Sequence, residues 1–324
     1  MNKGNYPDVG EFVNGDATKI SWSRALKADL GRFIKRSFKG DCVTQSLYRP
    51  FTKEWSYFDR HFNEVVYQMP RIFPDSTVKN RAICVIGRGA TKDFCAFITD
   101  TLPDYEMISK GQCFPLKLFE TLEVVADDGD DTDAAKPQNE MFNDAPVKDL
   151  FDKGITKVGK YGVRDGITDA GLQHFKDAYQ GQQISKEDLF YYIYGLLHSE
   201  DYKKRYADNL SKELPRIPAV KKFADFQAFS AAGRKLADLH IGYESVKPYP
   251  VEIEGGALLL SSFTDADYRV TQMKFPSKAD KTRVAYNHKI TMTGIPLEAY
   301  DYVVNGKPAL AWVMERQAVT THKD

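Results

Sequence analysis

A glycine-rich turn gives the sequence its clearest chemical signal. Residues 87–92 (GRGATK) come directly after an apolar, strand-like run at residues 82–86, and a glycine turn in that position can hold phosphate groups. The turn lacks the Gly-Lys-Ser/Thr ending of a nucleotide-binding P-loop and the third glycine of a dinucleotide-binding motif. Two interpretations therefore stay open: a tight surface turn that carries Arg88 and Lys92, or a turn whose cations contact phosphate.

Other sequence patterns associated with catalysis are missing. No GxSxG or HExxH motif occurs, and the six histidines are dispersed. His198 and His240 each end an apolar helical stretch, where a packed or capping imidazole is expected. The four cysteines form no CxxC pair, which favours buried reduced thiols over disulfides or a zinc site. We therefore expect no catalytic residue, no metal and no cofactor in this chain, and a standalone enzyme is the least supported function.

The composition predicts a folded, soluble protein. Hydrophobic residues make up 42% of the 324 residues, which is enough for a core, and the length suggests two units or one composite domain. No apolar run approaches the roughly 20 residues that cross a bilayer, and residues 1–12 lack the apolar stretch of a signal peptide. We expect a cytoplasmic protein without membrane contact.

The formal net charge of zero conceals three segments of different sign. Residues 1–119 carry 18 basic and 13 acidic side chains, a net charge of +5, and residues 153–324 carry 25 and 21, a net charge of +4. Residues 120–152 between them carry 2 basic and 11 acidic side chains, a net charge of −9. Two basic regions therefore flank one acidic insert, so the neutral average does not argue against a polyanionic partner.

Residues 19–39 are predicted to form one basic helix. Apolar side chains recur there at spacings of three, four and seven, which gives one buried stripe. The other faces carry Arg24, Lys35 and Arg36, among further cations, against the single acid Asp29. This face could contact a polyanion, or it could be the solvent side of a helix that packs on another domain.

Two more basic sites could reach a nucleic acid. Residues 157–164 (KVGKYGVR) are predicted to be a glycine-rich surface loop, and its candidate backbone contacts are Lys157, Lys160 and Arg164. Arg49, within Tyr48–Phe51, has three open interpretations: contact with a nucleic acid, a bidentate ion pair that fixes its strand, or stacking on an aromatic ring.

The elements that must position these residues predict an α+β fold. Short β-branched and aromatic runs dominate residues 46–123, helices dominate about 165–243, and strands return after Pro248 with short terminal helices near 297–304 and 308–316. Ser185 and Asp188 form a capping-box pattern before LFYYIYGLL, which is aromatic all round and therefore predicted to be buried. The expected divisions are a basic linking helix (1–45), a β-rich subdomain (46–123), an acidic flexible insert and loop (124–160), and a helical plus β recognition subdomain (161–324).

Seven ordered segments together resemble one protein family. They are SLYRPF (46–51), WSYFDR (55–60), VYQMP (66–70), ISKEDLFYYIYGLLHS (184–199), LPRIP (214–218), GRKLADLH (233–240) and ALAWV (309–313). This set is similar to the region that follows the methyltransferase core in type ISP restriction–modification enzymes, from about residue 20 onward. Those enzymes combine a nuclease, a helicase-like translocase, an N6-adenine DNA methyltransferase and a target-recognition domain in one polypeptide.

The resemblance implies sequence-specific binding of double-stranded DNA. This chain lacks the family's glycine-rich S-adenosylmethionine loop, its Asn-Pro-Pro-Tyr-type motif and any Walker motif. The catalytic work, with S-adenosylmethionine, ATP and Mg as cofactors, would then belong to methyltransferase and helicase-like domains elsewhere on the parent polypeptide. The alternative is a coupling module that docks on those domains and has little DNA affinity of its own. Steeply salt-dependent duplex binding would separate the two.

Overall fold

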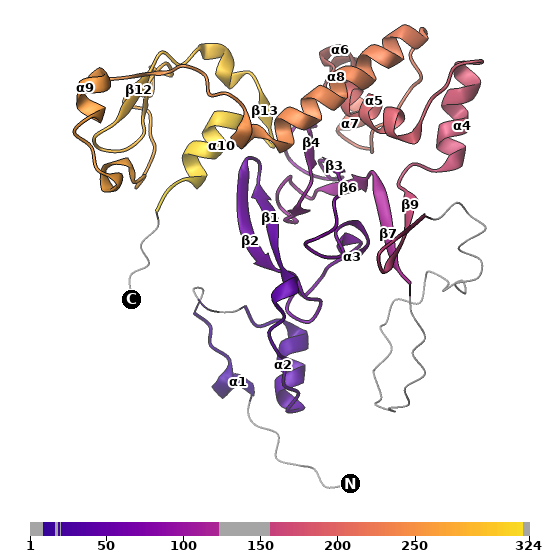
Figure 1. Cartoon of the computed structure of the whole chain (residues 1–324), viewed down its shortest axis with the longest axis horizontal. Coiled ribbons are helices and arrows are strands. Elements are labelled where there is room, and N and C mark those ends of the chain that lie inside the picture. Colours follow the sequence, from indigo (N-terminus) through magenta and orange to yellow (C-terminus); the bar gives the residue numbers. More distant parts are fainter. Residues whose placement is uncertain (1–8, 17–18, 20, 123–155, 320–324) are drawn as a thin grey trace.

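The computed structural model describes residues 9–16, 19, 21–122 and 156–319, without the side chains of residues 9, 257 and 258, and shows the expected mixed α+β fold. Most of the acidic insert expected at 124–160 lies outside the described residues. The described part contains five small sheets and several helices that are arranged around one central sheet (Figure 1).

The central sheet has the strand order β4–β3–β6. Its strands are β3 (Ala82–Val85), β4 (Ala96–Thr99) and β6 (Gln112–Pro115). Because side chains alternate across a strand, Ile83 and Val85 pack in the core shared with the helices, whereas Cys84 and Ile86 pack in a second core on the opposite face. Both strands are buried at every position, which explains why β3 is apolar throughout and β4 is apolar up to its last residue, Thr99.

A layer of helices covers one face of this sheet. The helices are α4 (Asp169–Ala178), α5 (Lys186–His198), α6 (Glu200–Arg205), α7 (Ala207–Leu210) and α8 (Phe223–Ile241). The predicted capping box is present, since Ser185 Oγ accepts from Asp188 N at 3.0 Å and Asp188 accepts from Ser185 N at 3.2 Å. The aromatic run of α5 is core as expected, because Tyr192 and Tyr194 are completely enclosed.

Two further sheets lie beside the central one. The first consists of β1 (Val43–Arg49), β2 (Thr52–Tyr57) and β5 (Leu102–Pro103), and the second of β7 (Lys117–Thr121), β8 (Thr156–Val158) and β9 (Tyr161–Asp165). A short helix, α3 (Met69–Ile72), contacts β7. Since β7 pairs with β9, this second sheet joins the chain before and after residues 123–155.

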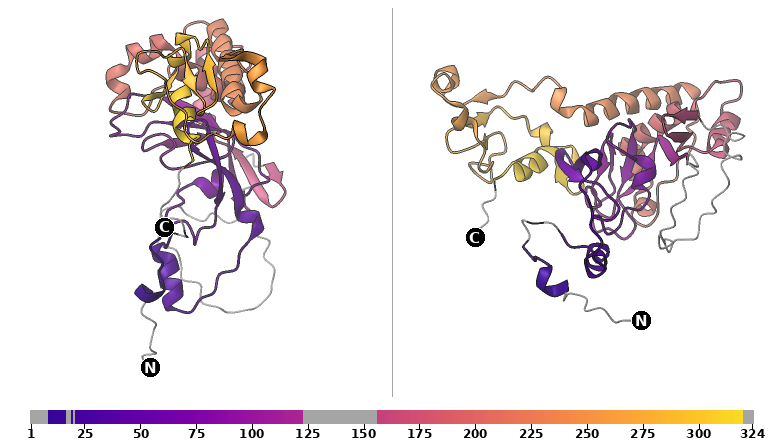
Figure 2. Two further views of the ribbon diagram at one scale, coloured as in Figure 1. Left: turned by 90° about the vertical axis from the view of Figure 1, so that its left-hand side faces the viewer. Right: turned by 60° about the horizontal axis from the view of Figure 1, so that its bottom comes forward.

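The C-terminal part forms a small lobe to one side of the sheets and then returns to them (Figures 1 and 2). Its elements are β10 (Glu252–Ile253), α9 (Gly256–Leu260), β11 (Val284–Ala285), β12 (Thr291–Thr293), β13 (Val303–Val304), β14 (Lys307–Pro308) and α10 (Ala309–Arg316). The lobe has its own core around Val284 and Ile295, whereas Val304 and Trp312 belong to the core under the central sheet. The chain end therefore anchors the lobe to the sheet.

The structure corrects the predicted helix at residues 19–39. After the short α1 (Val9–Phe12), helix α2 covers only Arg24–Gly31. Ser23 caps its start by accepting from Leu26 N at 3.1 Å. The chain turns away at Phe33, whose φ of 58° is left-handed, and Ile34 N donates back to the Asp29 carbonyl at 2.9 Å. This reversal closes the helix although the apolar spacing continues beyond it.

Three other local predictions also differ from the structure. Within the helical region predicted at about 165–243, the chain breaks at Tyr206 between α6 and α7. Residues 268–275, in the region predicted to return to strands after Pro248, pair only through a single bridge from Lys274 to Ala285. Residues 156–165 form the β8–β9 hairpin instead of a surface loop, because β9 gains β7 as a second, distant partner.

Candidate nucleic-acid interface

The loop between β3 and β4 is held in place by the segment that leads to β6. Gly87 N donates to the Ser109 carbonyl at 3.1 Å, and Lys110 Nζ donates to the Gly89 carbonyl at 2.9 Å. A Cβ on Gly87 would lie 1.8 Å from the Lys110 carbonyl oxygen, so only glycine permits this approach. The loop therefore presents Arg88 and Lys92 to solvent from a fixed backbone.

The hairpin turn between β13 and β14 supports the same loop from the C-terminal end of the chain. Asn305 Oδ1 accepts from Ser109 N at 3.1 Å, and Asn305 N donates to Cys95 Sγ at 3.3 Å. Asn305 and Gly306 have φ values of 50° and 78°, as an Asn-Gly hairpin turn requires. A Cβ on Gly306 would lie 3.0 Å from Lys92 Cδ, so the Lys92 stem runs along this turn.

Strand β14 and helix α10 each add one more cation next to the turn. Lys307 pairs with Glu315, and its Nζ lies 4.7 Å from the Trp312 ring centre. Arg316 Nη2 lies 3.0 Å from Glu315 Oε1, and its guanidinium carbon lies 5.7 Å from the centre of the Tyr48 ring. The Glu315 carboxylate therefore pairs with both Lys307 and Arg316, so these three side chains together carry a net positive charge.

Arg49 completes this surface at the end of β1. Its Nη1 lies 2.7 Å from Asp104 Oδ1, and its guanidinium carbon lies 4.0 Å from the Tyr48 ring centre. The ring contact considered for Arg49 is thus present, and so is an ion pair, but it runs through Nη1 alone and is not bidentate. Helix α10 approaches the β1–β2 hairpin (Figure 1). We call the surface formed by Arg49, Arg88, Lys92, Lys110, Lys307 and Arg316 the basic junction.

Within the described part of the chain, the candidate cations differ in whether a carboxylate holds them. Arg88 and Lys92 are exposed and form no ion pair there. The same holds for Lys35, after α2, and for Lys157 on β8. By contrast, Arg24 pairs with Glu64, and Arg36 Nε lies 2.7 Å from Asp29 Oδ2. The structure therefore does not gather the predicted cations on one face, since those on α2 lie at the far end of the fold from β4 (Figure 1).

The cations of the β8–β9 hairpin are largely engaged. Arg164 Nε lies 3.3 Å from Glu120 Oε1, and Lys160 Nζ lies 3.5 Å from Asp75 Oδ2. Burial alone would raise the pKa of Asp75, but hydrogen bonds from Thr77 and from the Tyr161 hydroxyl outweigh it and bring this pKa to about 2. Asp75 is thus a stable anion that holds Lys160, and only Lys157 extends free from this hairpin.

Three cations of the basic junction were not singled out from the sequence. Lys110, Lys307 and Arg316 each sit in an otherwise ordinary segment. The one local signal was Asn305-Gly306, a hairpin-turn pair that places Lys307 directly after the turn. Their proximity to Arg88 depends on contacts between segments nearly 200 residues apart, which no local pattern reveals.

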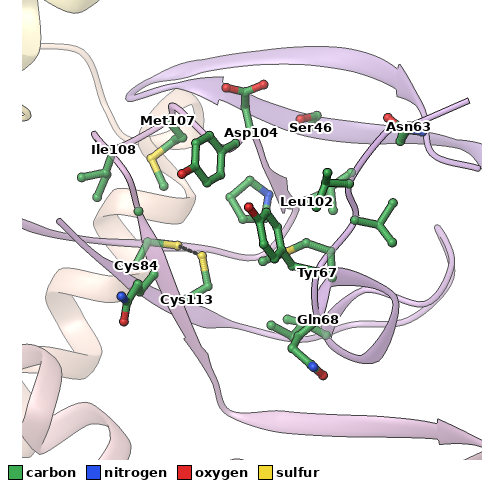
Figure 3. Close-up of a pocket in the computed structure, with 18 of the residues that line it drawn as sticks. Ser46, Asn63, Tyr67, Gln68, Cys84, Leu102, Asp104, Met107, Ile108 and Cys113 are labelled. Carbon is green, nitrogen blue, oxygen red and sulfur yellow. Dashed lines mark hydrogen bonds between the residues drawn. The ribbon is translucent and has the colours of Figure 1, made fainter. Parts of the chain in front are cut away.

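A pocket of about 510 Å³ opens beside the basic junction. Lys110 and Asp104 belong to its wall, together with side chains from β1, β5, β6 and the segment around Tyr67. Figure 3 shows Tyr67 reaching between Leu102 and Cys113, with the thiols of Cys84 and Cys113 at one end and the Asp104 carboxylate turned away. The two Sγ atoms are 2.9 Å apart.

Among the described residues, no group of three or more His, Cys, Asp or Glu side chains could hold a metal ion. No helix in the described ranges is long and apolar enough to cross a membrane.

The chain is similar to one protein family over nearly its whole length. Residues 4–324 match the model of the type ISP C-terminal specificity domain. A comparison with curated proteins gives no match.

Three solved structures resemble the fold. A nuclease-deletion mutant of the type ISP restriction-modification enzyme LlaGI, in complex with a DNA substrate mimic, has 33% identity and a TM-score of 0.70 over 98% of this chain. The ATP-dependent type ISP enzyme LlaBIII bound to DNA has 31% identity and a TM-score of 0.72 over 94%. The DrdV–DNA complex has 31% identity and a TM-score of 0.74 over 98%. The matched regions make up 20%, 17% and 27% of those three chains.

Proposed function

The chain belongs to the family of type ISP C-terminal specificity domains, and on this premise we propose that it recognises a specific sequence in double-stranded DNA. It would position the target adenine for a methyltransferase domain elsewhere on a parent polypeptide. Removing a base from the duplex stack costs a few kcal/mol, and groove contacts from this chain would help to offset that cost.

The observation that carries this proposal is the rigid presentation of Arg88 and Lys92. Both cations are exposed, lack a carboxylate partner among the described residues, and project from a loop fixed by Ser109, Lys110 and the β13–β14 turn. Binding phosphates releases counterions, and a guanidinium can bond guanine through two parallel hydrogen bonds. Because the scaffold already fixes this loop, both types of contact can form without ordering its backbone.

The DNA-bound state of the three similar structures supports the same assignment. Phosphate contacts in our proposal come from Arg88 and Lys92 and, further away, from Lys35 and Lys157. Arg24, Arg36, Arg49, Lys160 and Arg164 would need to exchange a carboxylate for a phosphate, so they are weaker candidates.

The chemistry of the parent enzyme belongs to the same proposal. Methylation, translocation and cleavage would reside in domains that supply S-adenosylmethionine, ATP and Mg sites, whereas this chain would contribute recognition and no catalytic residue. LlaBIII is an ATP-dependent enzyme, which fits a motor among those domains.

Fluorescence anisotropy with a labelled random-sequence duplex tests the proposal. We expect binding that weakens steeply with salt, with a log–log slope of about −0.9 for each phosphate contact. Absence of binding at low salt would contradict autonomous DNA recognition and would favour the docking module. If the chain does bind, a selection from a random duplex library would identify its preferred DNA sequence.

A further inference from the structure

The pocket beside the basic junction has an exposed aromatic rim. The rings of Tyr67 and Tyr105 stack with their centres 6.0 Å apart and their planes inclined by 17°. They remain 68% and 56% exposed, although both line the pocket. A stacked pair that leaves ring faces in water offers a platform for another flat aromatic group.

The backbone at this rim is held in an unfavourable conformation. Tyr67 has a φ of 46° and Lys110 a φ of 50°, so two of the pocket's residues are left-handed without being glycine. Such conformations persist where the surrounding structure enforces them, and they are frequent at binding sites. Here they place a ring and a cation at the same opening.

The interior of the pocket offers both apolar and polar contacts. Leu102, Met107 and Ile108 provide apolar walls. Ser46 and Gln112 also line the pocket, and their side chains form no hydrogen bond within the described ranges of the structure. A hydroxyl and an amide can each donate and accept, which suits the mixed edge of a nucleobase.

From this combination we infer that the pocket receives a single unpaired nucleobase of the bound DNA. The base stacks on the Tyr67–Tyr105 pair, its edge faces Ser46 and Gln112, and Lys110 attracts the adjoining phosphate. The cavity of about 510 Å³ is within the usual size range for small planar ligands. This inference rests on the proposed function, since the base must come from DNA held at the basic junction.

The test compares two duplexes that differ by one base. Each carries a single-nucleotide bulge, which holds a normal base in one duplex and an abasic residue in the other, so the phosphates are identical. We expect the full chain to bind the duplex with the base roughly tenfold more tightly, as base–aromatic stacking predicts. Equal affinities for the two duplexes would overturn the inference.

Variants assign the preference to the rim. The double substitution Tyr67→Ala/Tyr105→Ala should abolish the tenfold ratio and leave binding of the abasic duplex and its salt dependence unchanged. Tyr67→Phe/Tyr105→Phe should keep the ratio, because it keeps the rings. Trp55→Ala removes a ring that is 74% exposed and does not line the pocket, and it should also keep the ratio. A ratio that survives the double alanine substitution would contradict the role of this rim.

A second measurement separates this inference from the proposed function. If the chain binds neither duplex, autonomous DNA recognition fails, and the pocket is tested with free nucleoside 5′-monophosphates by saturation-transfer NMR. Transfer to base protons that disappears in the double alanine variant would support the pocket. Absence of transfer from the wild-type chain to the base protons would overturn it.

Discussion

Gly195 of α5 and Gly233 of α8 lie against each other where the two helices cross. A Cβ on Gly233 would be 2.7 Å from Gly195 N and 2.0 Å from the Tyr191 carbonyl oxygen. A Cβ on Gly195 would be 2.4 Å from the Phe229 carbonyl oxygen. The backbones of the two long helices are therefore in direct contact, and this contact sets the helical layer on the central sheet.

Gly233→Ala tests this crossing. Although alanine favours a helix, the obstacles here are backbone atoms that cannot rotate away, so we expect a loss of about 1–3 kcal/mol in the free energy of unfolding. Thermal denaturation followed by circular dichroism measures it. Gly40→Ala is the matched control, because a Cβ there meets nothing within 4 Å. An unchanged melting temperature in Gly233→Ala would show that the helices separate at little cost.

Arg88→Ala/Lys92→Ala tests the basic junction. We expect the double variant to keep its fold, to bind duplex DNA roughly tenfold more weakly at low salt, and to lose roughly one unit of salt slope per phosphate contact removed. The control is Lys204→Ala/Lys212→Ala, which removes two exposed cations near α6 and α7. Equal binding by the two double variants would remove the β3–β4 loop from the interface.

The buried imidazole of His240 should make the stability of the fold depend on pH. Burial, with a smaller contribution from His198, lowers the pKa of His240 from 6.5 to about 3. His240 therefore binds a proton near pH 6.5 in the unfolded chain but only near pH 3 in the folded chain. The contribution of this group to the free energy of unfolding is fully present above about pH 6.5. As the pH falls from there toward 3, the free energy of unfolding decreases by up to about 1.4 kcal/mol per pH unit.

Melting temperatures measured from pH 8 to pH 4.5 check this dependence. His240 Nδ1 lies 2.5 Å from the Tyr194 hydroxyl, so His240→Gln should lower stability at pH 8 and flatten the acid slope. His288 is exposed, and His288→Asn should leave the slope as in the wild type. A slope that His240→Gln does not change would assign the acid sensitivity to other groups.

The thiols of Cys84 and Cys95 should be unreactive in the folded protein. A hydrogen bond with Cys113 and complete burial raise the pKa of Cys84 well above its ordinary value, and burial raises the pKa of Cys95 to about 11. Because the thiolate is the reactive form, iodoacetamide at pH 8 should leave both unmodified in native protein and should modify both in denaturant. Peptide mass spectrometry reads the result; rapid native labelling of Cys84 would show that the central sheet opens readily.

Much of the local structure could be predicted from the sequence because the causes are local. The capping box at Ser185 involves atoms three residues apart, and the apolar texture of β3 and β4 reflects burial of both sheet faces. The glycine turn at residues 87–92 was also placed correctly between two strands. The identity of the family followed from seven ordered segments, which together are specific.

Only the tertiary structure decided which cations are free. Arg24 and Glu64 are 40 residues apart, and Arg49 and Asp104 are 55 residues apart, yet each pair is in contact. The early end of α2 at Phe33, the hairpin at Lys157 and the approach of Gly306 to Lys92 likewise depend on backbone geometry and distant partners. Residue type and spacing state which charges exist, but the free energy of an ion pair falls steeply with distance. Because folding sets those distances, it separated the cations already held by carboxylates from Arg88 and Lys92, which stay exposed and form no ion pair with the described residues.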